Sequence, residues 1–398
     1  MKLKAVTVIV AALTLAACGG EQPKEVTAEV PHGYVEGAEE AAEAQSRLIV
    51  ADAGTGAVRV VDLITEEVHE TGQVDGVRAL TTDGRFGYLT AHDGTARVID
   101  SGSWMVDHGD HVHYYRAKVR DVGVAPGKQP LSAYSDPAVA ALSYSDGTTT
   151  LLDRAQLDKG AVAELGKITR EPHAAVAIPY GGHVLASVAE PGKQLGRGVR
   201  VHDRQGKAVA EIPEPCPDLQ GQAVTRRGVV FGCADGALLV TEKDGVFTGS
   251  KIPYPRSVDA QERATAFFHR PGAATLAARA GEAAAWFLDI GRRGWQYVET
   301  GPVTAVSAVG EGGQLLALTR DGTLRSFDGN GKEQAAVPLL TPEAAAADGP
   351  SIQVDTTRAY VNNPLSADVY EIDYNDNLRR ARTLKVGGKA SHIVETGR

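Results

Sequence analysis

Three histidines and two carboxylates lie within nine residues of this 398-residue chain, and no other stretch carries so many potential metal ligands. The stretch reads Asp107-His108-Gly109-Asp110-His111-Val112-His113-Tyr114-Tyr115. Side chains alternate faces along an extended segment, so His111 and His113 can offer two imidazoles to one ion. Neutral imidazole suits Zn, Cu, Ni or Fe, whereas Ca and Mg prefer oxygen ligands. The stretch therefore predicts a metal site, and the alternative is a polar surface loop that is rich in histidine.

A phrase that recurs along the chain indicates how further ligands could reach this stretch. A turn residue followed by glycine precedes an acidic residue at a constant spacing. The phrase occurs at Thr55-Gly56 to Asp62, Asp93-Gly94 to Asp100, Asp146-Gly147 to Asp153, Asp235-Gly236 to Glu242 and Asp321-Gly322 to Asp328. A tight hairpin turn needs positive φ, which glycine adopts easily, and a second alternating run precedes each phrase. Each unit is therefore expected to hold about four strands.

Repeated four-stranded units of about 40 to 50 residues are typical of a β-propeller. The expected inner strands begin near Val77, Val122, His173, Gly221, Thr265, Val303, Ser351 and His392. This count predicts an all-β, eight-bladed propeller, and seven blades remain possible because residues 119–212 are irregular. The strand at Ser391–Thr396 has no chain left to complete a blade, while Arg47–Asp62 lacks an inner strand. Pairing the two is expected to close the ring and remove an exposed sheet edge.

The inner strands of a propeller all start on one face, around the central channel. Asp107–Tyr115 is expected to lie between two blades and over the mouth of this channel, with His173 and His392 at the first positions of inner strands. The predicted zinc ligands are therefore His111, His113, His173 and His392, in a tetrahedral site. His108 and Asp110 are reserve ligands, or acceptors that fix an imidazole tautomer. The alternative for His173 and His392 is a hydrogen-bonded histidine at a strand end.

The N-terminus resembles a bacterial lipoprotein signal. Residues 1–17 carry two lysines and then an apolar run too short to span a membrane, and they end on small residues directly before Cys18. This predicts cleavage before Cys18, which then carries lipid, and an extracytoplasmic protein attached to the cell membrane. The alternative is an uncleaved anchor. Residues 18–46 are acidic and contain Pro and Gly, so a flexible tether is expected there, followed by the propeller over 47–398.

The charge excludes some partners. The formal charge is -9, and removing Lys2 and Lys4 with the signal leaves -11. Such a chain is a poor match for nucleic acid or anionic lipid, so membrane attachment is expected only through the lipid.

The two remaining cysteines, Cys216 and Cys233, are expected to form a disulfide, because an exported chain meets an oxidising compartment. A thiolate zinc site is the alternative, but residues 217–232 contain no histidine.

Several motifs resemble those of the AztD zinc chaperones, exported β-propellers that serve zinc ABC importers. The similarity covers nearly all of Arg47–Arg398. It rests on residues 108–115, on Pro172-His173-Ala174-Ala175-Val176, on Cys216-Pro217-Asp218-Leu219 with Gly232-Cys233-Ala234-Asp235-Gly236, and on Ser391-His392-Ile393.

The resemblance implies extracytoplasmic zinc binding and direct delivery of zinc to the solute-binding protein of the importer, by a monomer without enzymatic activity. Two features depart from the family. The tether offers only one histidine, His32, and the predicted lipid anchor differs from a freely soluble periplasmic protein.

Two other classes of function are alternatives. A propeller lactonase or other hydrolase would need three zinc ligands, an open coordination position and a base, for which Asp110 could serve. A quinoprotein is disfavoured because three tryptophans cannot supply its repeated docking motif. An interaction scaffold would leave the histidine stretch without a metal role.

Overall fold

The computed structural model describes residues 33–108, 110–127, 130–310 and 312–398. The predicted signal peptide, Cys18 and His32 lie outside this range. The chain divides into two units, Met1–Tyr34 and Val35–Arg398, and all of the strands given below belong to the second unit. Within the described ranges, no helix has both the length and the apolar character needed to cross a membrane.

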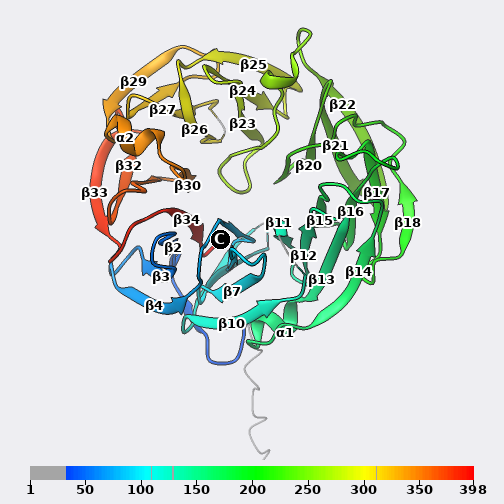
Figure 1. Ribbon diagram of the computed structural model, residues 1–398, viewed down its shortest axis with the longest axis horizontal. Coiled ribbons are helices and arrows are strands. Elements are labelled where there is room, and N and C mark those ends of the chain that lie inside the picture. The colour runs from blue at the N-terminus through cyan, green and yellow to red at the C-terminus, as the bar shows by residue number, and fades with distance from the viewer. Residues whose placement is uncertain (1–32, 109, 128–129, 311) are drawn as a thin grey trace, which may run out of the picture. The chain divides into compact units, whose positions relative to one another are not determined.

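The second unit is all-β, and its sheets are arranged around a central axis as in a propeller (Figure 1). Each sheet is antiparallel and runs outward from an inner strand. The first four sheets, from the inner strand outward, are β5 (Ala79–Thr82), β6 (Phe86–Thr90), β7 (Ala96–Asp100) and β10 (Arg120–Ala125); β11 (Pro130–Ser135), β12 (Val139–Tyr144), β13 (Thr148–Asp153) and β14 (Glu164–Thr169); β15 (Ala177–Tyr180), β16 (His183–Val188), β17 (Gly198–His202) and β18 (Ala208–Glu211); and β19 (Gln222–Thr225), β20 (Gly228–Cys233), β21 (Gly236–Lys243) and β22 (Val246–Pro253).

The remaining ring sheets have the same pattern, although one has three strands. They are β23 (Thr275–Ala280), β24 (Ala284–Asp289) and β25 (Gly294–Glu299); β26 (Val303–Ala308), β27 (Leu315–Thr319), β28 (Thr323–Phe327) and β29 (Glu333–Pro338); β30 (Ile352–Val354), β31 (Ala359–Asn362), β32 (Asp368–Asp373) and β33 (Arg379–Lys385); and β34 (His392–Thr396), β2 (Arg47–Ala51), β3 (Ala57–Asp62) and β4 (Val68–Gln73). Two short helices, α1 (Arg154–Asp158) and α2 (Pro342–Ala346), and a 3-10 turn at Ala260–Glu262 lie in loops.

The recurring glycine phrase marks the turn between the second and third strands of five sheets. All five glycines have positive φ, as the turn requires: Gly56 at 73°, Gly94 at 82°, Gly147 at 83°, Gly236 at 140° and Gly322 at 86°. The second strands that lead into these turns are almost wholly buried, because both faces pack against neighbouring sheets. The recurring glycine phrase therefore marks a hairpin turn at the end of the buried second strand of a sheet.

The two ends of the second unit meet in one sheet. β34 pairs antiparallel with β2 over five residue pairs, from Arg47 opposite Thr396 to Ala51 opposite His392. Arg47 is buried, and its Nη1 donates to the carbonyl oxygens of Ser101, at 2.6 Å, and Ala117, at 3.1 Å. The end of β34 that carries Thr396 therefore lies beside residues 101–117.

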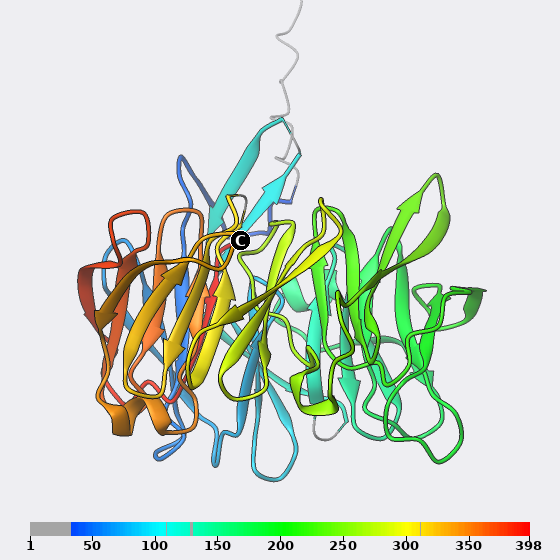
Figure 2. The same ribbon diagram turned by 90° about the horizontal axis from the view of Figure 1, so that it is seen from above.

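A ninth sheet among the described residues stands outside the ring. It contains β1 (Glu39–Ala41), β9 (Val112–Arg116) and β8 (Ser103–Asp107), in that order. Figure 2 shows the cyan hairpin of β8 and β9 rising above the ring. The sequence placed this stretch between two blades, with the next inner strand at Val122, and this was wrong. β10 is the outer strand of the sheet that contains β7, so the hairpin is an insertion between the third and fourth strands of one blade.

The segment before Arg47 also differs from the expected tether. The second unit begins at Val35, and Glu39–Ala41 pairs with β9 at three positions. Gln45 is buried and its carbonyl oxygen accepts a hydrogen bond from the Ser103 hydroxyl. A short acidic run forms a strand here because the exposed edge of β9 offers it unpaired backbone groups.

Cys216 and Cys233 are joined by a disulfide with a Cα–Cα distance of 4.9 Å. Both cysteines are buried, and the bond ties the loop before β19 to the end of β20. The closed loop spans 17 residues, so replacing both cysteines with alanine is expected to lower the free energy of unfolding by about 3 kcal/mol. Urea titration of the oxidised protein and the double variant measures this difference. Two titratable thiols in the denatured, unreduced protein would contradict the bond.

Glu395 is a fully buried carboxyl on β34, and its Oε2 lies 2.8 Å from Nη1 of Arg398. Burial raises its pKa to about 7, against the opposing effect of Arg398. The folded protein therefore holds this proton more tightly than the unfolded chain. The resulting stabilisation is complete below about pH 4.5 and is lost as the pH rises through about 7.

Glu395→Gln keeps the shape of the side chain and removes its titration. We expect the variant to gain stability relative to the original protein between pH 5 and pH 8, by at most on the order of 3 kcal/mol. Denaturation of both metal-free proteins across this range is the measurement. Parallel stability profiles would show that Glu395 does not titrate in this way.

Candidate metal centre

The histidine stretch forms the tip of the β8–β9 hairpin. The turn is held by a hydrogen bond from the His108 backbone N–H to the His111 carbonyl oxygen, at 2.9 Å. His113 and Tyr115 share one face of β9, since alternate residues point the same way. The hairpin therefore carries its histidines well above the ring.

The base of the hairpin is packed, whereas its tip is open. The buried Tyr115 ring stacks on Trp104 with centroids 5.4 Å apart, and the Arg85 guanidinium lies 3.7 Å over the Trp104 ring. Arg85 makes two hydrogen bonds to the buried Asp100 carboxylate, at 3.0 and 2.9 Å. Burial alone would raise the pKa of Asp100, but Arg85 and Arg120 hold it below its usual value. The charged and hydrogen-bonded residues at the foot of the hairpin, Arg85 and Asp100, thus fix its direction.

Three imidazoles converge at the tip. One ligand nitrogen from each of His108, His111 and His113 lies within 4.8 Å of the others, and this is the one such cluster in the part of the chain that the structure describes. Nε2 of His111 and Nε2 of His113 are 3.1 Å apart. Two nitrogen ligands of a tetrahedral zinc ion lie about 3.3 Å apart, given a Zn–N distance of 2.0–2.1 Å. The spacing of this pair therefore fits one bound zinc ion.

Carboxylates fix the tautomers of two of these rings. Nδ1 of His111 lies 2.7 Å from Oδ1 of Asp110, and Nδ1 of His113 lies 2.6 Å from Oε1 of Glu40. An ionised carboxylate only accepts hydrogen bonds, so each Nδ1 carries the proton and each neutral ring keeps its lone pair on Nε2. Nitrogens 3.1 Å apart can share either a proton, as an N–H···N hydrogen bond, or a metal ion that both of them ligate. With a metal ion on Nε2, this donor set would have the carboxylate–histidine–metal order found around zinc.

His173 is not part of this cluster, contrary to the sequence prediction. Its ring is fully buried, Nδ1 donates to the Glu171 carbonyl oxygen at 2.6 Å, and Nε2 accepts from the Ser187 hydroxyl at 2.8 Å. The Ser187 oxygen in turn accepts from the backbone N–H of Val176. Both ring nitrogens are occupied, so His173 holds the start of β15 in place.

His392 is also separated from the cluster. It begins β34 opposite Ala51, whereas the hairpin rises beside Thr396 at the other end of the same strand. Four residue intervals correspond to about 13 Å of strand. Burial lowers the pKa of His392. The structure does not bring the four predicted histidines together, because the histidine hairpin and the starts of the inner strands lie on opposite faces of the ring.

Of the two reserve ligands, His108 belongs to the cluster, and Asp110 binds Nδ1 of His111. Glu40 was missed altogether. It lies in β1, 73 positions from His113, inside a run of glutamates that reads as a solvated tether. No local pattern marks it, and only the pairing of β1 with β9 reveals it.

Glu40→Gln is expected to weaken zinc binding by about 10- to 100-fold, the usual effect of removing the carboxylate partner of a histidine ligand. Glu39→Gln is the matched control, because Glu39 lies on the same strand and its carboxylate binds Arg116, at 2.9 Å, instead of a ring. Competition with a fluorescent zinc chelator measures both constants. Equal constants for the two variants would contradict the role of Glu40.

Comparison with known proteins shows what the chain is similar to. The zinc chaperone AztD of Citrobacter koseri is 24% identical over 375 residues, which span 88% of this chain and 86% of that protein. The chain resembles AztD. The crystal structure of Citrobacter koseri AztD superposes with a TM-score of 0.74 at 22% identity, covering 89% of this chain and 98% of that one, and apo AztD gives the same TM-score at 21% identity and the same coverage. The predicted resemblance to AztD is thus confirmed, and the AztD structures establish the fold.

No protein-family model matches the sequence. The dihydro-heme d1 dehydrogenase NirN has a TM-score of 0.52 at 13% identity, covering 88% of this chain and 75% of that one. That similarity is one of propeller fold only.

Proposed function

We propose that this protein is a zinc metallochaperone that delivers zinc to the solute-binding protein of a zinc ABC importer. The observation that carries the proposal is the cluster of His108, His111 and His113, with the Nδ1 atoms of His111 and His113 bound to carboxylates. The similarity to a protein named as a zinc chaperone supports the same role.

The position of the site suits transfer of an ion to another protein. The His111 and Asp110 side chains are 57% and 83% exposed, so a second protein can reach the metal. Three nitrogen ligands leave one tetrahedral position open. A ligand from the acceptor can occupy that position before the histidines leave, which passes zinc through a shared-ligand intermediate without release to water. Imidazole binds metal only when neutral, so we expect zinc affinity to fall in acid.

The propeller is the rigid support in this scheme. We propose eight blades, with the β34–β2 pairing as the closure of the ring, because this pairing joins the two ends of the second unit in one four-stranded sheet. The radial sheets of a propeller expose only short, protected edges, which agrees with the proposal of a monomer.

We further propose that the protein works outside the cytoplasm, held to the membrane by lipid at Cys18. The support is the signal-like sequence of residues 1–17 and the disulfide between Cys216 and Cys233, which suits an oxidising compartment.

A zinc hydrolase would also use three ligands and an open position. The exposed hairpin tip favours the chaperone, because enzymes generally bind small substrates in a concave pocket that encloses them. Asp110, the residue that could act as a base, lies against His111.

The test is zinc transfer in the presence of a chelator strong enough to trap free ion. The zinc-loaded protein, purified without an affinity tag, is mixed with the zinc-free solute-binding protein of a zinc ABC importer and the chelator. We expect the acceptor to fill at a rate that the chelator does not change. Complete interception by the chelator would rule out direct delivery, and a protein that contains no zinc would rule out the site.

A further inference from the structure

The strand that supplies Glu40 is the least secured element of the hairpin sheet. β9 pairs with β8 at five positions, from Ser103 opposite Arg116 to Asp107 opposite Val112, and a turn joins these strands covalently. β1 pairs with β9 at only three positions, ending at Ala41 opposite Tyr114. β1 follows a turn at Gly37, which has φ of +84°, and the Ala38 N–H donates to the Val35 carbonyl oxygen across this turn, at 2.9 Å. The edge of β9 is therefore covered by a strand of only three residues.

The side chains of β1 divide between its two faces. Glu39 points to one face, where its carboxylate binds Arg116 at 2.9 Å, and both side chains are more than half exposed. Glu40 points to the other face and binds His113. Exposed ion pairs contribute little to stability, since water solvates the separated charges nearly as well. The β1 side chains thus hold the strand weakly, while one of them supports a metal ligand.

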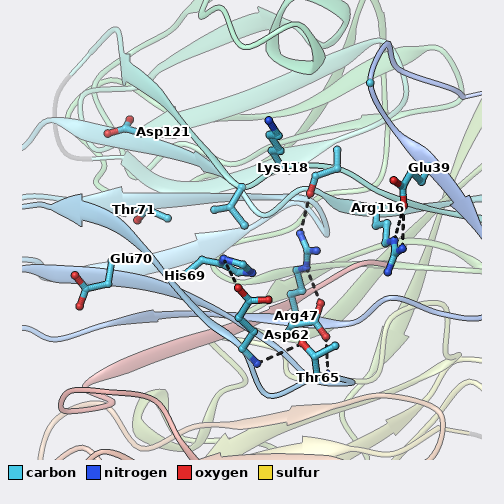
Figure 3. Close-up of a pocket in the computed structure, with 14 residues that line it drawn as sticks. Glu39, Arg47, Asp62, Thr65, His69, Glu70, Thr71, Arg116, Lys118 and Asp121 are labelled. Carbon is cyan, nitrogen blue, oxygen red and sulfur yellow. Dashed lines mark hydrogen bonds and ion pairs between the residues drawn. The ribbon is translucent and has the colours of Figure 1, made fainter.

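A pocket of about 660 Å³ lies beside this strand, at the base of the hairpin. Figure 3 shows Glu39 and Arg116 at one side of it, with Arg47 bound to Asp62 nearby. Gly37 and Glu39 of the β1 segment line the pocket on one side, and His69 and Thr71 of β4 line it on another. A polypeptide segment has room to approach the edge of β9 from this side as β1 leaves.

We infer that an extended segment of the acceptor protein replaces β1 on the edge of β9, and that this exchange removes Glu40 from His113. The inference rests on the proposed function. The edge of a sheet accepts any extended chain, because main-chain hydrogen bonds provide the binding. Once Glu40 leaves, His113 loses the carboxylate that fixes its tautomer and raises its basicity, and the zinc is held less tightly. Docking of the acceptor and release of the ion are then one coupled event.

Coupling of this kind is reciprocal. If β1 strengthens zinc binding, bound zinc must stabilise the pairing of β1 with β9 by the same factor. Amide hydrogen exchange tests this directly: zinc is expected to slow exchange at residues 39–41 of the full chain, and addition of the zinc-free acceptor is expected to speed it. Exchange at these residues that zinc does not alter would overturn the coupling.

A covalent lock on β1 tests the exchange itself. Glu39 and Arg116 lie directly opposite each other on the face away from the zinc site, so the Glu39→Cys/Arg116→Cys variant can be cross-linked by a disulfide. The Glu39→Ser/Arg116→Ser variant is the matched control, since it loses the same ion pair without a lock. We expect the locked protein to bind zinc as tightly as the original protein but to transfer it at least about tenfold more slowly, because the exchanged state is scarcely populated. The serine control is expected to transfer at the original rate or faster.

Equal transfer rates for the locked and control variants would overturn strand exchange, and would indicate that the acceptor binds elsewhere or adds to the outer edge of β1. The original protein is measured first in the same assay. If it does not transfer zinc to the acceptor directly, the proposed function fails; if it transfers and the lock has no effect, only the strand exchange fails.

Discussion

Zinc affinity is expected to fall by at least about a thousandfold when His111 and His113 are both replaced with alanine. The free energy of binding for a structural zinc site is about 10–16 kcal/mol, so two of its ligands account for several kcal/mol, and each 1.4 kcal/mol is a factor of ten. The fold should be unaffected, because both side chains lie at the tip of a hairpin that stands outside the ring. Zinc content of untagged protein, chelator competition and the melting temperature of the metal-free protein measure these effects.

Two single variants test whether histidines outside the hairpin contribute to zinc binding. His69→Ala removes a partly exposed histidine from β4 and is expected to leave zinc affinity unchanged. His392→Ala is the decisive comparison, since the sequence places His392 in the site and the structure places it at the far end of β34. The zinc affinity of the His392→Ala variant is expected to equal that of the original protein. A loss as large as that of the double variant would mean that His392 reaches the hairpin histidines in the zinc-bound protein.

Ending the chain after Gly388 is expected to abolish the stable monomer. The truncation removes β34, which fills the innermost position of its sheet. Ile393 and Val394 are almost fully buried, and each such side chain contributes about 1.5–3 kcal/mol. The lost packing, five backbone pairs and the hydrogen bond from the Thr396 hydroxyl to Arg47 together approach the 5–15 kcal/mol stability of a typical domain. Thermal melting and size-exclusion chromatography measure the outcome.

Removal of Arg398 alone is the control for this truncation. Arg398 contributes hydrogen bonds to the Val354 carbonyl oxygen and to Glu395, but no part of the β34 ladder. A small drop in melting temperature and a monomer are expected. If the Gly388 truncation remained monomeric with an unchanged melting temperature, β34 would not secure the ring.

The repeating pattern of this chain could be read directly because it is local. A glycine at a tight turn and an acid at the end of the following strand reflect the backbone conformation of a few consecutive residues, and all five glycines have the expected positive φ. The pairing of Ser391–Thr396 with the first hairpin was also predictable from counting strands, since each incomplete sheet needed what the other supplied. The composition of His108–His113 was likewise sufficient to indicate a cluster of potential metal ligands.

The partners of those histidines depended on information that no local pattern holds. The sequence treats a hairpin inserted within one blade and a loop between two blades alike, yet the two lie on opposite faces of the ring. Once β10 (Arg120–Ala125) proved to be an outer strand, His173 and His392 could not reach the hairpin. Their polar rings serve instead at the starts of inner strands, where His173 is fully hydrogen-bonded.

Glu40 is a residue of the site that no local sequence pattern identifies. A glutamate in an acidic run has no sequence signature for metal chemistry, and it became part of the site only when β1 covered the edge of β9. The sequence by itself determined the fold class, the hairpin turns and the three histidines, because these depend on neighbouring residues. The tertiary structure decided which face carries the site, through the pairing of β10 with β7, and which carboxylate supports it, because Glu40 lies 73 positions from His113.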